Sequence, residues 1–214
     1  MKKLVIAVTI LISAISASAQ TSTVKDIFLT RDIVWYGLDF SKARFVGQFD
    51  QGFGIAPAKG TDMRDRWIPG WNNLIGQEPQ NFELRKTFRK DHVYYDLSAV
   101  TEINSQIDAD VCMSYNPTKI STAEIDEMVK RYNGSAKSGI GLVLIVENFS
   151  KSGLVAEVHV TFFDIATKQV LLTDKVTGKP MGNGMRNFWA GAIKNILHNI
   201  DGSYYRIWQK QYSK

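Results

Sequence analysis

"GIGLVLIVENFS", residues 139–150, is apolar almost without a break. An apolar run of this length, rich in β-branched residues, is typical of a strand that is covered on both faces. The next segment, residues 153–165 (GLVAEVHVTFFDI), alternates between two sets of side chains, as a strand does. Asp164 can hydrogen-bond its own backbone two residues on, as turn residues do. Residues 169–176 (QVLLTDKV) are then expected to form the third strand. These segments predict a three-strand antiparallel meander.

The segments before this meander predict a mixture of strands and helices. Three of them are interpreted as strands: residues 32–47, 92–97 and 109–115. Three others are interpreted as helices: residues 68–78, residues 82–90 after a cap at Asn81, and residues 98–106. The mixture predicts strands and helices within one layered structure rather than an all-helical bundle.

The clearest helix signal begins at Ser121, which forms a capping box with Glu124. Gly134 is a suitable stop for this helix. A second amphipathic helix is predicted at the C-terminal end. Its apolar stripe consists of Trp189, Ile193, Ile196, Ile200, Tyr204 and Ile207. The element order predicts an α/β (α+β) fold with a single mixed sheet, a C-terminal three-strand antiparallel meander, and helices packed on the sheet.

The first 19 residues predict a secretory signal peptide. Lys2 and Lys3 precede a short apolar run, and the segment ends in small residues at Ala17 and Ala19. The apolar run is too short to span a bilayer, which takes about 20 apolar residues. We therefore expect a signal peptide over residues 1–19 and a single exported α/β domain over residues 20–214. No transmembrane segment is expected, and the leader is of a bacterial type.

Residues 38–47 (LDFSKARFVG), residues 160–184 (VTFFDIATKQVLLTDKVTGKPMGNG) and the terminal helix carry a resemblance to a known group. Their order, with a turn from Asp164 to Thr167, resembles the exported α/β domain of the curli-secretion lipoprotein and TolB amino-terminal type. It also resembles small secreted bacterial proteins of unknown function. The chain lacks the lipid-anchoring cysteine of the curli-type lipoproteins, so the resemblance does not imply a lipid tether.

The charge balance does not favour nucleic acid as a partner. The net charge of +5 falls to +3 once Lys2 and Lys3 are removed with the leader, which is a mild excess. The densest basic stretch is expected to be a solvated helix face, and an anionic partner such as a lipid headgroup or acidic glycan is the alternative. Its basic residues are Arg85, Lys86, Arg89 and Lys90.

The sequence contains no constellation that indicates catalysis, a metal site or a cofactor. Cys112 is the only cysteine and is expected to be a small buried hydrophobe without a neighbouring base. His92, His159 and His198 lie far apart, without metal-ligand spacing. His159 is expected at the surface or between layers. We therefore predict no catalytic residue, no metal and no cofactor.

Two segments are candidates for ligand binding. Trp67 and Trp71 lie four residues apart, close to arginine and asparagine side chains that a sugar or peptide cleft would use. The alternative is that the two indoles fill the core. In the second segment, Gly182 and Gly184 precede Arg186 at the start of the last helix, where backbone N–H groups favour an anion. The spacing matches no nucleotide-binding loop, so turn geometry is the alternative there.

These features support two hypotheses for function. The first is an exported, non-enzymatic α/β module that binds a protein or another cell-envelope component, in the periplasm or outside the cell. The second is a periplasmic protein that binds a small ligand or glycan. Neither the identity of the partner nor the oligomeric state follows from the sequence.

Overall fold

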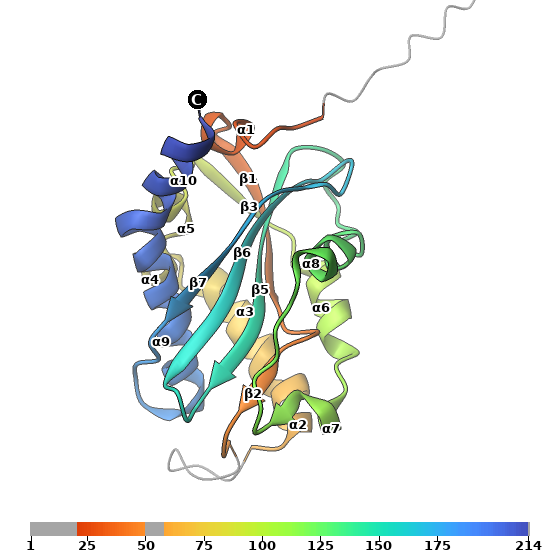
Figure 1. Cartoon of the computed structure of the whole chain (residues 1–214), viewed down its shortest axis with the longest axis vertical. Helices are drawn as coiled ribbons and strands as arrows, with labels where there is room; N and C mark the ends of the chain where they lie inside the picture. Colours follow the sequence, from red (N-terminus) through yellow and green to blue (C-terminus); the bar gives the residue numbers. More distant parts are fainter. Residues whose placement is uncertain (1–20, 50–57, 214) are drawn as a thin grey trace, which may run out of the picture.

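The computed structural model describes residues 21–49 and 58–213 as a seven-stranded sheet with helices on both faces (Figure 1). The predicted signal peptide, residues 1–19, and its cleavage point before Gln20 lie outside the described residues. Within the described ranges, no helix combines the length and the apolar character that crossing a lipid bilayer requires.

Strand β5 (Ile140–Ser150) is the centre of the sheet. Ten of its eleven residues are buried, as the unbroken apolar run predicts. Strand β6 (Val155–Asp164) pairs with β5 in the antiparallel direction along its whole length, and β7 (Val170–Gly178) pairs with β6 in the same way. The turn between β6 and β7 is held by the Asp164 carboxylate, which accepts a hydrogen bond from the Thr167 N–H at 2.8 Å.

The other edge of β5 carries two parallel strands placed end to end. Strand β1 (Asp32–Asp39) pairs with the first half of β5, and β2 (Arg44–Val46) pairs with its last three residues. Because β6 occupies one edge of β5 throughout, β1 and β2 must share the remaining edge. Two outer strands, β3 (His92–Tyr95) and β4 (Met113–Ser114), run parallel to β1 and β2 respectively.

The prediction of a mixed sheet with helices packed on it is confirmed. The sheet is mostly parallel, however. Among the described strands, antiparallel pairing is limited to the three C-terminal ones, β5, β6 and β7. The strand predicted over residues 109–115 is wrong for most of its length. Asp108 accepts a hydrogen bond from the Asp110 N–H and caps a helical turn, α7 (Ala109–Cys112), so only β4 remains extended.

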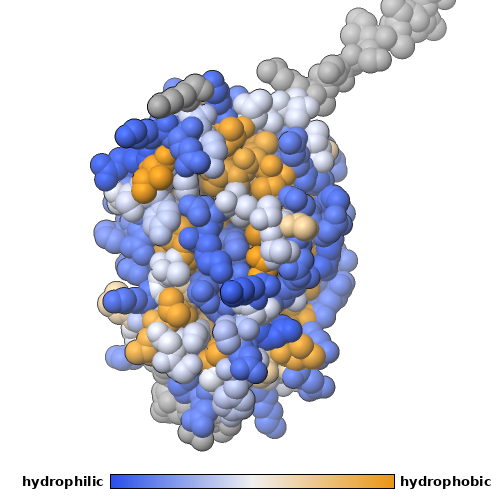
Figure 2. Space-filling view, viewed as in Figure 1, coloured by the Kyte–Doolittle hydropathy of each residue, from blue (hydrophilic) through white to orange (hydrophobic). Residues whose placement is uncertain are grey.

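Two hydrophobic clusters lie on opposite faces of the sheet. The larger cluster packs against α3, α9 and α10, and the smaller one packs against α6 and α8. On the face seen in Figure 2, apolar residues form separate patches among hydrophilic ones.

The helices are α1 (Asp26–Leu29), α2 (Gly60–Asp62), the π-helix η1 (Met63–Trp67), α3 (Ile68–Gln77), α4 (Pro79–Phe82), α5 (Leu84–Thr87), α6 (Ser98–Ser105), α7, α8 (Thr122–Val129), α9 (Gly184–Asn199), the π-helix η2 (Ile200–Tyr204) and α10 (Tyr205–Tyr212).

The basic stretch does not form the single helix that was predicted after Asn81. Glu83 adopts a left-handed conformation with φ 37°, which separates α4 from α5. Lys90 is buried, and its ammonium group donates to the carbonyl oxygens of Ile27 and Thr30, so it belongs to no solvated face. Burial lowers the pKa of Lys90 to about 8.

The capping box of α8 is confirmed. The Ser121 hydroxyl accepts from the Glu124 N–H, and the Glu124 carboxylate accepts from the Ser121 N–H at 2.9 Å. The helix ends at Val129, before the predicted stop at Gly134. Tyr132, beyond the helix end, is also buried, and its hydroxyl donates to the Asp39 carboxylate at 2.6 Å.

The apolar stripe of the C-terminal helix is confirmed only as far as Ile200. The π-helix η2 follows, and its hydrogen-bonded turn contains one residue more than that of an α-helix. The residues after it are therefore shifted by about one position around the helix axis. Tyr205 and Trp208 are therefore buried in place of the predicted Tyr204 and Ile207, and Ile207 is 56% exposed. The Trp208 indole donates to the Asp174 carboxylate at 2.7 Å, which fixes α10 against β7.

A bulge in β1 depends on a glycine. The pairing of β1 with β5 shifts between Trp35 and Gly37, and Gly37 has a φ of 107°. A Cβ atom on this residue would lie 2.5 Å from Oδ1 of Asn72 and 3.0 Å from the Leu97 side chain. Gly70 offers a contrast, because a Cβ atom there would meet nothing within 4 Å and the residue lies inside α3.

Gly37→Ala is expected to lower the free energy of unfolding by about 2 kcal/mol or more, because it combines a positive φ with a steric clash. The matched change Gly70→Ala is expected to raise it by about 0.5 to 1 kcal/mol, because alanine favours a helix interior. Urea unfolding of the two variants and the parent chain measures both effects. Equal effects of the two changes would contradict this explanation of the bulge.

Candidate functional site

The candidate site lies beside the part of β1 that extends beyond the end of its outer neighbour, β3. Strand β3 pairs with β1 only from Asp32 to Trp35, so the backbone of Leu38 and Phe40 has no strand on that side. Two buried asparagine side chains take the place of a strand. The Asn72 amide accepts from the Leu38 N–H at 2.7 Å and donates to the Leu38 carbonyl at 3.0 Å, and Asn104 accepts from the Phe40 N–H at 2.8 Å.

These bonds position two helices around the end of β1. Asn72 belongs to α3 and Asn104 to α6, and Asn104 also donates to the Leu38 carbonyl at 2.9 Å. Because a buried backbone N–H or carbonyl needs a partner, the amides hold both helices at a fixed distance from the strand. In open α/β sheets, ligands commonly bind beyond the carboxyl ends of parallel strands, and this end of β1 is such a place.

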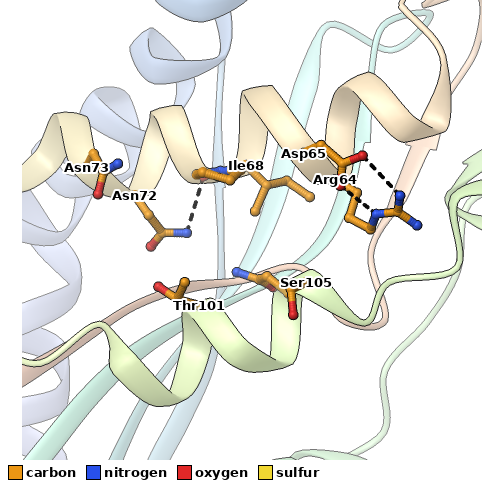
Figure 3. Close-up of a pocket in the computed structure, with 9 residues that line it drawn as sticks. Arg64, Asp65, Ile68, Asn72, Asn73, Thr101 and Ser105 are labelled. Atoms are coloured by element: carbon orange, nitrogen blue, oxygen red, sulfur yellow. Dashed lines mark hydrogen bonds and ion pairs between the residues drawn. The ribbon is translucent and has the colours of Figure 1, made fainter.

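A cavity of about 290 Å³ opens between the two helices (Figure 3). The apolar part of its wall is formed by Ile68 and Pro69 of α3. Figure 3 shows Thr101 and Ser105 of α6 on the opposite side from Ile68 and Arg64. The complete lining is Arg64, Asp65, Ile68, Pro69, Asn72, Asn73, Thr101, Asn104 and Ser105.

The lining contains one ion pair. Arg64 and Asp65 form a two-pronged contact, with Nε to Oδ1 at 2.7 Å and Nη2 to Oδ2 at 3.0 Å. The hydrogen bond to Asp65 raises the pKa of Arg64, and the same bond lowers the pKa of Asp65. Both side chains therefore stay charged around neutral pH, and together they contribute no net charge to the cavity.

Several neutral groups of the lining remain available for a ligand. Neither the Asn73 amide nor the Thr101 hydroxyl makes a side-chain hydrogen bond to any part of the chain that the structure describes. The Ser105 hydroxyl donates to the Glu102 carbonyl at 2.7 Å and keeps its capacity to accept. The arrangement can hydrogen-bond a neutral polar molecule against an apolar surface.

The two predicted tryptophans lie next to this cavity but do not line it. Trp71 is 2% exposed, stacks on Phe40 and meets Phe149 edge-on, as the core interpretation expects. Trp67 is partly buried, with the Arg66 guanidinium 4.5 Å from the centre of its ring. A role for the two indoles in binding stays a prediction. The cavity is lined instead by neighbouring residues of the same segment, among them Arg64, Ile68 and Asn72.

The second predicted segment shows the backbone geometry that turns require. Gly182 and Gly184 have φ angles of 120° and 75°, which side chains disfavour. The Arg186 guanidinium lies 3.4 Å from the Glu78 carboxylate, so its charge already has a partner. Anion binding at this helix start stays a prediction. The structure joins the two predicted segments, because the Trp71 indole donates to the Arg186 carbonyl at 3.0 Å.

A buried polar cluster connects the three antiparallel strands. The Glu147 carboxylate, 1% exposed, contacts the His159 ring nitrogen at 2.8 Å and the Lys175 ammonium group. It also accepts from the Ile120 N–H at 2.8 Å, which anchors the chain just before α8. Burial raises the pKa of Glu147, but the hydrogen bonds from its partners outweigh burial and lower it overall. The cluster's contacts indicate a structural anchor.

The sequence placed His159 at the surface or between layers, and the structure places it between layers at 7% exposure. His198 is exposed. Cys112 is buried, which confirms its expected role, and burial raises the pKa of its thiol. Among residues 21–49 and 58–213, no three His, Cys, Asp or Glu side chains gather as metal ligands.

Comparison with known proteins gave no match, either to family models or to curated proteins. The resemblance to the exported domain of the curli-secretion lipoprotein and TolB type therefore stays a prediction. The α6 residues of the cavity were missed by sequence reasoning. The available signal was the presence of asparagines at helix positions that otherwise belong to apolar faces, at Asn72 and Asn104.

Asn72→Ala is expected to lower the free energy of unfolding by about 1 to 3 kcal/mol, because it leaves the buried Leu38 N–H without an acceptor. Its neighbour Asn73 is the matched control, since its side chain is exposed. Asn73→Ala is expected to change stability by less than about 0.5 kcal/mol. Chemical unfolding monitored by circular dichroism measures both, and a similar loss for both variants would rule out the strand-replacement role.

Proposed function

We propose that this chain is an exported, non-catalytic α/β module that binds a small, neutral, polar ligand in the cavity between α3 and α6. The observation that carries this proposal is the pairing of uncommitted groups, Asn73 and Thr101, with the apolar wall at Ile68 and Pro69. Binding sites commonly combine an apolar wall with a few polar groups in this way. The charge-neutral lining favours an uncharged ligand.

The size of the cavity limits the ligand. A volume of about 290 Å³ lies at the lower end of the usual range for small-molecule sites. A monosaccharide or a capped amino acid suits this volume, whereas a longer oligosaccharide would extend beyond it. The lining contains no aromatic ring, so hydrogen bonds rather than stacking would orient the ligand.

A panel of neutral monosaccharides, N-acetylated monosaccharides and capped amino acids is expected to contain a ligand that binds saturably by isothermal titration calorimetry. Thr101→Val keeps the shape of the side chain and removes its hydroxyl, and is expected to weaken binding about tenfold. Asn73→Ala is expected to weaken it similarly without loss of stability.

Gln77→Ala provides the control, because Gln77 is exposed on the same helix and does not line the cavity. It is expected to leave the dissociation constant unchanged. Absence of binding across the whole panel, or equal binding by the parent chain and Thr101→Val, would refute the proposal.

A second candidate function is the binding of a partner protein of the cell envelope, and the edge strand β3 supports it. Tyr94 and Tyr95 are 57% and 43% exposed. In the described part of the chain, β3 pairs only with β1, so its outer edge is open. An exposed strand edge with aromatic side chains favours addition of an extended segment from a partner.

Replacement of Tyr94 by a photo-crosslinking amino acid in the native host is expected to yield one defined covalent adduct. The control position is Tyr115, which is 74% exposed and lies outside the edge strand. An adduct from position 94 and none from position 115 supports the partner surface. Equal adducts from both positions, or none from position 94, would argue against it.

A further inference from the structure

A second cavity, of about 230 Å³, lies at the break between β1 and β2. The chain leaves β1 at Asp39, makes a turn in which the Ala43 N–H donates to the Phe40 carbonyl, and enters β2 at Arg44. This turn, α7 and the segment before α8 enclose the cavity. The residues used below are Ser41, Lys42, Arg44, Asp108 and Glu124.

Three charged side chains of this cavity have polar partners that suit their charge, and a fourth does not. The Lys42 ammonium group contacts the Glu124 carboxylate at 2.6 Å, so these two charges offset each other. The Asp108 carboxylate accepts from the Asp110 N–H at 2.9 Å and caps α7. A carboxylate at the N-terminus of a helical turn is stabilised by the N–H groups it faces.

Arg44 lacks such a partner. Its guanidinium donates to the Ala43 carbonyl at 3.1 Å, and no carboxylate in the described ranges lies within ion-pair distance of it. The side chain is partly buried. A partly buried guanidinium without a counter-ion is unfavourable, because its charge has lost part of its hydration.

The Ser41 hydroxyl is the second unpartnered group. Its oxygen is buried and has no hydrogen-bond partner in the described part of the chain, although the Ser41 N–H donates to the Asp39 carboxylate at 2.7 Å. Buried hydroxyls usually have a partner, so the Ser41 hydroxyl, in the lining of the cavity, is free to bond a group that enters it.

We propose that this second cavity binds a small anion that carries a carboxylate or phosphate group, with Arg44 as its counter-ion and the Ser41 hydroxyl as a donor. The guanidinium presents two N–H groups in the fork geometry that such anions accept. The site lies at the carboxyl end of a parallel strand, where ligands of α/β sheets commonly bind. It is separate from the α3–α6 cavity and does not depend on the function proposed for that cavity.

Isothermal titration calorimetry with inorganic phosphate and with acetate, at constant ionic strength in a neutral amine buffer, tests this proposal. We expect saturable binding of at least one probe below about 20 mM, and the stronger of the two identifies the preferred group. Arg44→Met keeps most of the aliphatic stem and is expected to weaken binding at least tenfold.

Ser41→Ala separates binding from folding. The hydroxyl makes no hydrogen bond to the part of the chain that the structure describes, so this variant is expected to retain the parent's unfolding midpoint and to weaken binding about threefold to tenfold. Arg206→Met is the matched control, because Arg206 is an exposed arginine outside the basic stretch and has no ion pair in residues 21–49 and 58–213. It is expected to bind the probe as the parent chain does.

Three results would overturn the proposal. One is the absence of saturable binding of either probe. Another is equal affinity of Arg44→Met and the parent chain. The third is an equal loss in Arg44→Met and Arg206→Met, which would show non-specific attraction to positive charge. Asn73→Ala, in the other cavity, is expected to leave phosphate and acetate binding unchanged, so the two sites are distinguishable.

Discussion

Two asparagine side chains satisfy the backbone of β1 where its outer neighbour has ended, and the rest of the structure follows from this constraint. Asn72 and Asn104 converge on Leu38 from α3 and α6, so both helices are fixed to one point of the strand. Gly37 must be a glycine because the Asn72 amide occupies the space of a Cβ atom. The cavity between the helices exists because the amides hold them apart, at the carboxyl end of a parallel strand.

The central strand imposes the second constraint. Because β6 occupies one whole edge of β5, the chain uses the opposite edge twice, first with β1 and then with β2. The turn between these strands leaves polar groups inside the protein. Asp39 accepts a hydrogen bond from the Tyr132 hydroxyl, whereas the Arg44 guanidinium and the Ser41 hydroxyl have no such partner within residues 21–49 and 58–213 and line a second cavity. The break between β1 and β2 thus leaves a paired polar group, Asp39, close to two polar groups, Arg44 and Ser41, that face a cavity.

The apolar patterns of the sequence were sufficient for much of the fold. They predicted the buried strand β5, its two successors, the capped helix α8 and the first half of the C-terminal stripe, because each depends on local periodicity. They failed where the backbone departs from the regular pattern. The π-helix η2 shifts the stripe onto Trp208, and the Asp108 cap converts a predicted strand into α7.

The sequence by itself determined most of the element types, much of the apolar core and the turn glycines, because these follow from side-chain chemistry over short distances. Only the tertiary structure decided which polar groups meet. Trp67 and Trp71 were candidates for a cleft, with core filling as the alternative, and the cavity is lined by neighbouring residues of the same helical segment and by residues of α6. Such a site joins segments far apart in the sequence, and no local period records their contact. Its position follows from the hydrogen bonds that a strand end requires.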